Sequence, residues 1–347
     1  MSHAATNTNV LIASYLETAY VERIRAESEV RVVYEPSLLP TPRYTSDHVG
    51  NPLQRSAGDE AKWREHLAWA EVMFDFDHPN LRSLAGLIPN VRWIQATSTG
   101  IGQTLVRSGL IDAPIIFTTA RGVHAGPLAD FALMAMLWFS KDGFLMMRDQ
   151  AAHRWQRYCA RRLKGATVAV IGLGTIGREV ARYARFMGMH VIGTRRHAES
   201  SAGLDGVVDR LVPTSTLTTI LPEADYVVLA VPHTSETEGL IGAREIASMK
   251  RGAVVINLAR GAVVDESAMI AALQGGRLGG AALDVFAKEP PEPTNPLWDL
   301  PNVLISPHSA STVDSENAAL TDLFCENLRR YRRGETLLNV FDRERLY

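Results

Sequence analysis

The chain contains three polar residues of types that support carbonyl reduction. They are Arg260, Glu289 and His308, and each lies just beyond a short apolar stretch. An arginine carries a permanent charge on a planar fork that matches a carboxylate. A histidine titrates near neutral pH and can donate a proton, and a neighbouring carboxylate favours its charged form. Such a set could hold a ketone that bears a carboxylate and protonate its oxygen as a hydride arrives. Each residue alone could also be an ordinary loop or turn side chain, so the interpretation depends on their sharing one place in the fold.

The apolar stretches before these residues are predicted strands of one parallel sheet. They are Tyr226–Val231, Ala253–Asn257, Gly280–Val285 and Asn302–Ser306, and helical segments such as Glu238–Met249 and Asp265–Leu273 separate some of them. Because ligands of open α/β sheets bind at the carboxyl ends of the strands, we expect the three polar residues at one crevice. Arg260 and His308 are thus candidates for both substrate and cofactor contact. Further candidate cofactor contacts at the strand ends are Val231, Pro232, Thr234, Ala259 and Asp284.

A glycine motif between two apolar runs predicts the cofactor site itself. A strand at Thr167–Ile171 is followed by glycines 172, 174 and 177, a helical pattern to Met187, and a second short strand at His190–Gly193. In such a motif Gly172 permits a tight turn, Gly174 lets a pyrophosphate approach the backbone, and Gly177 lets the helix pack on the strand. The helix N-terminus then attracts phosphate. The candidate contacts are Gly172, Gly174, Thr175, Ile176 and Gly177, and the alternative is a packed turn without a ligand.

The end of the second strand indicates which dinucleotide is preferred. NAD-binding chains usually carry Asp or Glu about 20 residues after the glycines, to hold the ribose 2′-hydroxyl. Here that position reads Thr194-Arg195-Arg196, without a carboxylate. Arginine can bind a phosphate with two parallel hydrogen bonds. We therefore expect Thr194, Arg195 and Arg196 to contact the cofactor and to favour NADP(H), with NAD(H) as the alternative cofactor. The alternative is a solvated basic loop.

The first third of the chain predicts a small parallel α/β domain. Its candidate strands are Thr8–Ser14, Val30–Tyr34, Glu71–Phe76, Val91–Ala96 and Pro114–Thr118, and its candidate helices are Glu17–Ser28, Asp59–Ala70 and Ile101–Arg107. The turn Ser98, Thr99, Gly100 and Ile101 could hold a carboxylate with its backbone N–H groups, or could be a plain strand-to-helix turn. Residues Glu35–Gly58 form a long polar insertion, either a surface loop without a role or a lid or oligomer arm. One long helix is expected within Gly122–Gly143.

Composition excludes several other classes of protein. The chain has 347 residues, which favours two domains, and 46% apolar and 21% charged residues are typical of a globular enzyme. A net charge of −2 gives no general attraction to nucleic acid or anionic membrane. Two distant cysteines, Cys159 and Cys325, exclude a disulfide framework. No signal peptide, membrane span or candidate metal ligand is evident, so we expect a cytoplasmic enzyme acting on a small molecule.

The motifs GLGTIG, VPHTSETEGLI, INLARGAVVDE, GAALDVFAKEPP and PHSA, in that order, resemble the D-isomer-specific 2-hydroxyacid dehydrogenase family. The resemblance implies an α/β fold of two Rossmann-like domains with doubly wound parallel sheets, in which the cofactor domain is inserted into a flavodoxin-like substrate domain. It implies a substrate domain at 1–119 and 312–347, a dinucleotide-binding domain at 120–311, and a homodimer. It places the family's catalytic arginine, glutamate and histidine on Arg260, Glu289 and His308. Its aspartate near the nicotinamide falls on Asp284, and its substrate-carboxylate turn falls near Ser98–Ile101.

Departures from the family pattern refine the expected activity. Gly102 stands where the family often has Asp, and Ala129-Asp130-Phe131 stands where it often has Ala-Glu-His, so the shape of the substrate pocket is open. Formate dehydrogenases of the family carry glutamine at the position of Glu289, which argues against formate. The Arg195-Arg196 pair resembles NADPH-preferring glyoxylate and hydroxypyruvate reductases. The alternatives are a non-catalytic NADP(H)-sensing protein resembling corepressors, and a phosphite-type dehydrogenase on the same scaffold.

Overall fold

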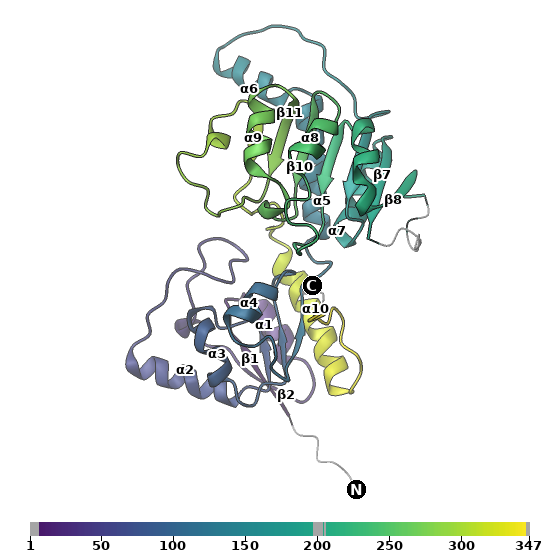
Figure 1. The fold of residues 1–347 in the computed structure, drawn as a ribbon. Coiled ribbons are helices and arrows are strands. Elements are labelled where there is room, and N and C mark those ends of the chain that lie inside the picture. Colours follow the sequence, from purple (N-terminus) through teal and green to yellow (C-terminus); the bar gives the residue numbers. More distant parts are fainter. Residues whose placement is uncertain (1–6, 197–203, 205, 345–347) are drawn as a thin grey trace. The chain divides into compact units, whose positions relative to one another are not determined.

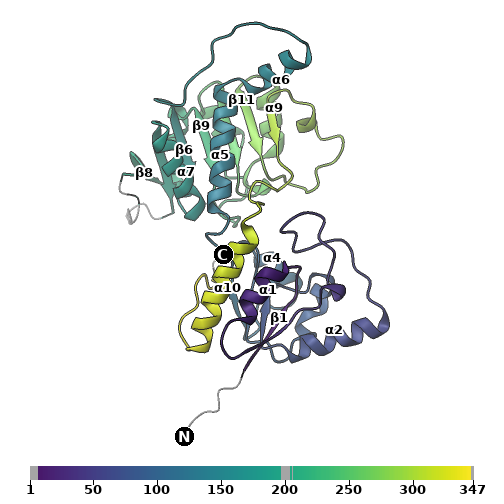
Figure 2. The same cartoon turned by 180° about the vertical axis from the view of Figure 1, so that it is seen from behind.

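The computed structural model describes residues 7–196, 204 and 206–344 of the chain. Their contacts divide the chain into two compact units, which Figures 1 and 2 show from opposite sides. The first unit comprises Met1–Val123 and Thr312–Tyr347, and the second comprises His124–Ser311. The second unit is therefore an uninterrupted segment that is inserted into the sequence of the first.

The first unit contains a five-stranded parallel sheet in the order β2-β1-β3-β4-β5. This order is that of flavodoxin-like folds, as the resemblance implies. The strands are β1 (Thr8–Ile12), β2 (Val30–Val33), β3 (Val72–Phe74), β4 (Trp93–Gln95) and β5 (Ile116–Thr118). All five lie within predicted strands.

Helices cover both faces of this sheet, which explains why its strands read as continuous apolar runs. On one face lie α1 (Thr18–Arg25) and α10 (Glu316–Arg332), where Phe324 stacks on Trp93 with ring centroids 5.1 Å apart. The other face is covered by α2 (Ala57–Trp69), α3 (Leu84–Leu87) and α4 (Gly102–Arg107). Two 3₁₀ helices, η1 (Pro36–Leu38) and η2 (His78–Ser83), complete the unit.

The polar insertion at residues 35–58 has a defined turn that is held by a buried carboxylate. Asp47 is 3% exposed and accepts hydrogen bonds from Arg43 Nε at 2.7 Å and from the backbone N–H of Gly50 at 3.0 Å. Partial burial alone would raise the pKa of Asp47, but these hydrogen bonds hold it well below its ordinary value. A role of the insertion as a lid or oligomer arm stays a prediction.

The second unit contains a seven-stranded parallel sheet in the order β12-β11-β10-β9-β6-β7-β8. The strand order reverses between β6 and β9, so this sheet is doubly wound as predicted, with its switch point there. The strands are β6 (Thr167–Ile171), β7 (His190–Arg195), β8 (Arg210–Pro213), β9 (Tyr226–Leu229), β10 (Ala253–Asn257), β11 (Leu278–Leu283) and β12 (Val303–Ile305). The edge strand β8 was not predicted, because only two of its four residues are apolar.

Helices cover both faces of the second sheet as well. On one face lie α5 (Ala125–Ser140) and α7 (Thr175–Phe186), which pack against each other in front of the strands in Figure 2. On the other face lie α8 (Ala243–Ser248) and α9 (Glu266–Gln274), in front in Figure 1. The predicted helix within residues 122–143 is α5. A further helix, α6 (Gly143–Ala151), follows it and was not predicted. No helix of the described residues is long and apolar enough to cross a membrane.

Candidate active site

The glycine motif forms the turn between β6 and α7, and each glycine has its own steric reason. Gly172 has a φ of +99°, and a Cβ there would lie 2.8 Å from the carbonyl oxygen of Ala230. A Cβ on Gly177 would lie 1.9 Å from the carbonyl oxygen of Gly172, so the helix could not pack against the turn. Gly174 instead borders open space, with nothing within 4 Å of its Cβ position.

These features fit a dinucleotide pyrophosphate. The open space at Gly174 lies where the backbone would meet the phosphates, and α7 begins at Thr175 with Gly174 as its N-cap and no side chain capping it. The first N–H groups of a helix carry a partial positive charge and attract phosphate. Thr175 and Ile176 form the first turn and are partly exposed, as their predicted contact with a cofactor requires.

Thr194 supports this turn from within the protein. Its side chain is fully buried, and its hydroxyl accepts hydrogen bonds from the backbone N–H of Gly172 and from the Thr214 hydroxyl, both at 3.1 Å. We therefore expect Thr194 to position the turn rather than to touch a ligand. The sequence motif does not reveal this role, because Thr214 lies 20 residues further along the chain.

Three arginines surround the turn, and one of them was not predicted. Arg195 Nε donates to the carbonyl of Leu173 and Arg178 Nε donates to the carbonyl of Gly174, each at 3.3 Å. Partial burial, and then the charge of Arg178, lower the pKa of Arg195. Arg196 instead pairs with Glu236 at 3.0 Å. Arg178 follows the third glycine directly, and its place in the first turn of the helix was the signal that could have identified it.

The predicted contacts after β9 and β10 lie in tight turns. The Thr237 hydroxyl donates to the carbonyl of Pro232 at 2.6 Å and accepts from the N–H of Thr234 at 2.8 Å, which fixes the turn that begins at Val231. After β10, the buried Asn257 accepts from the N–H of Ala259 at 3.0 Å and donates to the carbonyl of Arg260 at 3.2 Å. Asn257 thus positions the backbone that carries Arg260, and sequence reasoning missed it.

Arg260 is exposed, and its Nη1 donates to the carbonyl of Ala259 at 2.7 Å. Although Arg260 reaches the surface, the protein atoms around it displace part of its hydration and lower its pKa, whereas the charges of Glu289 and Asp284 raise it and only partly compensate. Because the ordinary pKa of arginine is so high, the guanidinium keeps its charge. Arg260 can therefore hold a carboxylate or polarise a carbonyl oxygen.

His308 and Glu289 form a hydrogen-bonded pair. His308 Nδ1 lies 2.7 Å from Glu289 Oε2, and Glu289 Oε1 accepts from the N–H of Phe286 at 3.0 Å. The hydrogen bond to Glu289 raises the pKa of His308 above its ordinary value, although burial opposes this. Burial would raise the pKa of Glu289, but the hydrogen bonds from His308 and Phe286 lower it overall. The pair therefore favours a charged imidazolium, whose Nε2 can donate a proton.

Asp284 shapes the loop that carries His308. It is 3% exposed, and its Oδ1 accepts from the Ser306 hydroxyl at 2.6 Å and from the N–H of Ala310 at 2.9 Å. Its carbonyl accepts from the N–H of His308 at 3.0 Å, where His308 has a φ of +53°. These contacts hold His308 in the left-handed region. A contact of Asp284 with a cofactor stays a prediction.

The candidate carboxylate turn at residues 98–101 belongs to the first unit. It follows β4 and leads into α4; Ser98 and Gly100 are exposed, whereas Ile101 is buried. The carbonyl of Ser98 accepts from the N–H of Ala120 at 3.1 Å, which ties the turn to the end of the neighbouring strand. Thr99 lies in the same turn and is partly exposed. Binding of a substrate carboxylate by this turn stays a prediction.

Comparison with known proteins identifies the family of this chain. The sequence profile of the D-isomer specific 2-hydroxyacid dehydrogenase, NAD binding domain, matches residues 133–310. A glyoxylate reductase of Thermococcus gammatolerans is 39% identical over 281 residues, which cover 76% of this chain and 78% of that protein. The crystal structure of a D-isomer specific 2-hydroxyacid dehydrogenase from Xanthobacter autotrophicus Py2, in complex with NADPH and MES, is 28% identical. It superposes with a TM-score of 0.77 over 99% of this chain and all of that one.

The chain belongs to the D-isomer specific 2-hydroxyacid dehydrogenase family. It is thus an oxidoreductase of the 2-hydroxyacid dehydrogenase and glyoxylate reductase type with a nicotinamide-dinucleotide-binding domain. The family identified from five sequence motifs and the fold implied by them are both confirmed.

Proposed function

We propose that this protein is an NADPH-preferring reductase of a small 2-keto acid such as glyoxylate or hydroxypyruvate. The observation that carries the proposal is the 2.7 Å contact between His308 Nδ1 and Glu289 Oε2, on strand-end loops next to that of Arg260. A histidine whose protonated form is favoured by a carboxylate, on a loop next to that of a permanent cation, is what reduction of a keto acid requires.

Each residue of this set has a separate task. When bound, the dihydronicotinamide supplies a hydride to the carbonyl carbon. Arg260 binds the carboxylate and polarises the carbonyl oxygen, where negative charge develops. His308 Nε2 donates its proton to that oxygen, and Glu289 keeps the imidazole charged and in one orientation. In the reverse direction the neutral His308 takes the proton back from the hydroxyl group.

The preference for NADPH rests on the arginines near the phosphate turn. Arg195 lies at the end of β7, where a carboxylate would hold the 2′-hydroxyl of NAD, and Arg178 adds a second positive charge nearby. The Xanthobacter relative was crystallised with NADPH, which is in keeping with this preference. Arg196 contributes only if it exchanges Glu236 for a phosphate.

Initial rates of NADPH and NADH oxidation, measured with glyoxylate, hydroxypyruvate, pyruvate and bulkier 2-keto acids, test this proposal. We expect the highest kcat/KM with NADPH and a small keto acid. Arg195→Gln should raise the KM for NADPH roughly tenfold, as expected for loss of a charge-assisted hydrogen bond, and leave that for NADH unchanged. Arg182→Gln, on α7 and paired with Glu179, is the control for loss of a charge elsewhere in the second unit.

The same measurements separate the rival functions. Equal use of both cofactors would show that Arg195 does not contact a 2′-phosphate. Binding of NADPH without turnover of any keto acid would indicate a sensor, and NADP⁺ reduction by phosphite alone would indicate a phosphite-type dehydrogenase. Either result would contradict the proposed reductase.

A further inference from the structure

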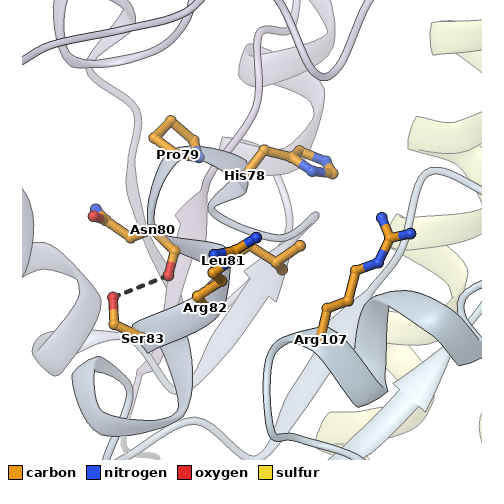
Figure 3. A pocket seen from close by; sticks show the side chains of 7 residues that line it. All are labelled: His78, Pro79, Asn80, Leu81, Arg82, Ser83 and Arg107. Atoms are coloured by element: carbon orange, nitrogen blue, oxygen red, sulfur yellow. Dashed lines mark hydrogen bonds between the residues drawn. The ribbon is translucent and has the colours of Figure 1, made fainter.

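A hollow in the first unit is lined by basic side chains and lies outside everything assigned so far. Its volume is about 380 Å³, and it is lined by the six residues of η2 and by Arg107, the last residue of α4. In Figure 3, Arg107 rises from α4 with its guanidinium on the same side of η2 as the His78 ring. The lining contains no carboxylate, and Arg260, Glu289 and His308 belong to the other unit.

Two arginines of this hollow, Arg82 and Arg107, are unpaired among the residues that the structure describes. Within residues 7–196, 204 and 206–344, neither Arg82 nor Arg107 has a hydrogen-bond or ion-pair partner for its guanidinium, and both are exposed. The arginines of neighbouring α2 and its preceding loop are paired instead. Arg64 contacts Glu60 at 2.9 Å, and Arg55 contacts Asp77 at 3.5 Å. The nearby carboxylates are therefore already engaged, and the two guanidiniums remain available for an external anion.

A buried carboxylate favours a third positive charge at the edge of the hollow. His78 Nε2 lies 3.4 Å from Oδ2 of Asp75, which is 1% exposed. Burial has the largest single effect and would lower the pKa of His78, but the charge and hydrogen bond of Asp75, together with the charges of Asp77 and Asp47, raise it overall. The other ring nitrogen, Nδ1, has no hydrogen-bond partner in the described part of the chain and can donate to a ligand.

The wall of the hollow is held in place before any ligand arrives. Asn80 Nδ2 donates to Asp77 Oδ2 at 2.8 Å, and Trp63 Nε1 donates to the same oxygen at 3.0 Å. The Ser83 hydroxyl donates to the carbonyl of Asn80 at 3.1 Å, shown as the dashed line in Figure 3. Because η2 is tied to the buried Asp77, binding would not need to order this segment, and pre-organisation favours affinity.

We propose that the hollow formed by η2 and Arg107 binds the phosphate group of a small phosphorylated molecule, as an accessory anion site of the enzyme. Two guanidiniums and an imidazolium match the charge and the several acceptor oxygens of a phosphate. The volume of about 380 Å³ is many times what a single water molecule requires, so a phosphate monoester with a short carbon chain has room. Inorganic phosphate shares the chemistry and would bind more weakly.

Line broadening of the ³¹P signals of inorganic phosphate and of glycerol 2-phosphate, titrated with protein, tests the proposal. The titration is made at constant ionic strength without a nucleotide, because the phosphate groups of NADP⁺ would compete for the hollow, and the arginine variants distinguish the hollow from the glycine turn. We expect the monoester to bind more tightly than inorganic phosphate. Arg82→Gln and Arg107→Gln should each weaken binding about tenfold or more, since each removes a charge-assisted contact. Circular dichroism confirms that the variants, both altered at exposed side chains, are folded.

Arg92→Gln is the matched control, because Arg92 is an exposed arginine of the same unit that does not line the hollow. The affinity of this variant for the monoester should stay within about twofold of that of the unmodified protein, because the charge of Arg92 lies outside the site. Equal weakening by Arg92→Gln, or unchanged binding after loss of Arg82 and Arg107, would overturn the proposal. Absence of broadening in the unmodified protein would do the same. The readout needs no turnover, so it stands apart from the test of reductase activity.

Discussion

A single hydrogen bond, between His308 and Glu289, sets the acid–base behaviour expected of this enzyme. Glu289 raises the pKa of His308, so the imidazolium needed to protonate the substrate persists to higher pH than in an isolated histidine. The reduction rate should be high below this raised pKa and fall as the pH rises through it. Arg260 acts in the opposite direction, since its charge lowers the pKa of His308 by a smaller amount.

Two variants test this assignment at the residue scale. His308→Ala should lower kcat for reduction by about 10²–10⁴-fold while NADPH binding survives, as for loss of a positioned acid. Glu289→Gln should move the fall in kcat/KM to lower pH, because the charge that stabilises the imidazolium is gone. The measurement is the pH profile of keto-acid reduction, together with NADPH fluorescence titration.

Glu292→Gln is the control for that shift. Glu292 lies in the same exposed loop and bonds Lys288, so its loss should leave the pH profile unchanged. A Glu289→Gln profile that coincides with that of the unmodified enzyme would remove Glu289 from the acid–base pair. Near-normal kcat after His308→Ala would remove His308 from the proton transfer.

At the scale of the element, the turn from β6 to α7 separates a packing requirement from a binding requirement. Gly177 faces the carbonyl of Gly172 at a distance that no side chain fits, whereas Gly174 borders open space and has a φ of −74°, which alanine adopts readily. Substitution of alanine for each of these two glycines should therefore have different effects on stability and on cofactor binding.

Gly177→Ala should lower the free energy of unfolding by about 1–3 kcal/mol, as overpacking does, and weaken cofactor binding as a consequence. Gly174→Ala should leave the free energy of unfolding within about 1 kcal/mol and still weaken NADPH binding roughly tenfold, because the methyl group meets the pyrophosphate. Urea denaturation and NADPH fluorescence titration measure the two effects. Tight binding by Gly174→Ala would place the phosphates elsewhere.

At the scale of the whole molecule, the second unit exposes apolar side chains that a monomer rarely leaves in water. Residues 151–159 are exposed throughout; Trp155 is 99% exposed, and Met147 on α6 is 55% exposed. Large exposed apolar residues in one segment mark a protein interface. The predicted homodimer is therefore expected to use α6 and the segment that follows it, with a second copy of this chain as the partner.

Light scattering coupled to size-exclusion chromatography should give twice the chain mass at micromolar concentration. Trp155→Ser combined with Met147→Ser should raise the dimer dissociation constant at least roughly tenfold, since buried aromatic anchors dominate interface energies. Phe186→Ser, which changes an 89% exposed side chain at the end of α7, is the control and should leave the mass unchanged. A monomer at every concentration would contradict the predicted homodimer.

The sequence alone determined the parallel sheets, the glycine turn and the order of the site residues along the strand ends. The reason is that these features depend on local patterns. Apolar runs form buried parallel strands, and the carboxyl ends of such strands meet at one edge whatever lies between them. Arg260, Glu289 and His308 could therefore be placed on adjacent loops from their spacing after β10, β11 and β12.

Only the tertiary structure decided where individual side chains point and which partners they find. Thr194 turned inward to support the glycine turn, Arg196 paired with Glu236, and Asn257 became the support of the Arg260 loop. The basic hollow of η2 and Arg107 arose because η2 and α4, which follow the neighbouring strands β3 and β4, lie side by side. Such pairings involve residues that are distant in sequence. Several partners compete for each side chain, and a local sequence pattern does not indicate which partner is bound.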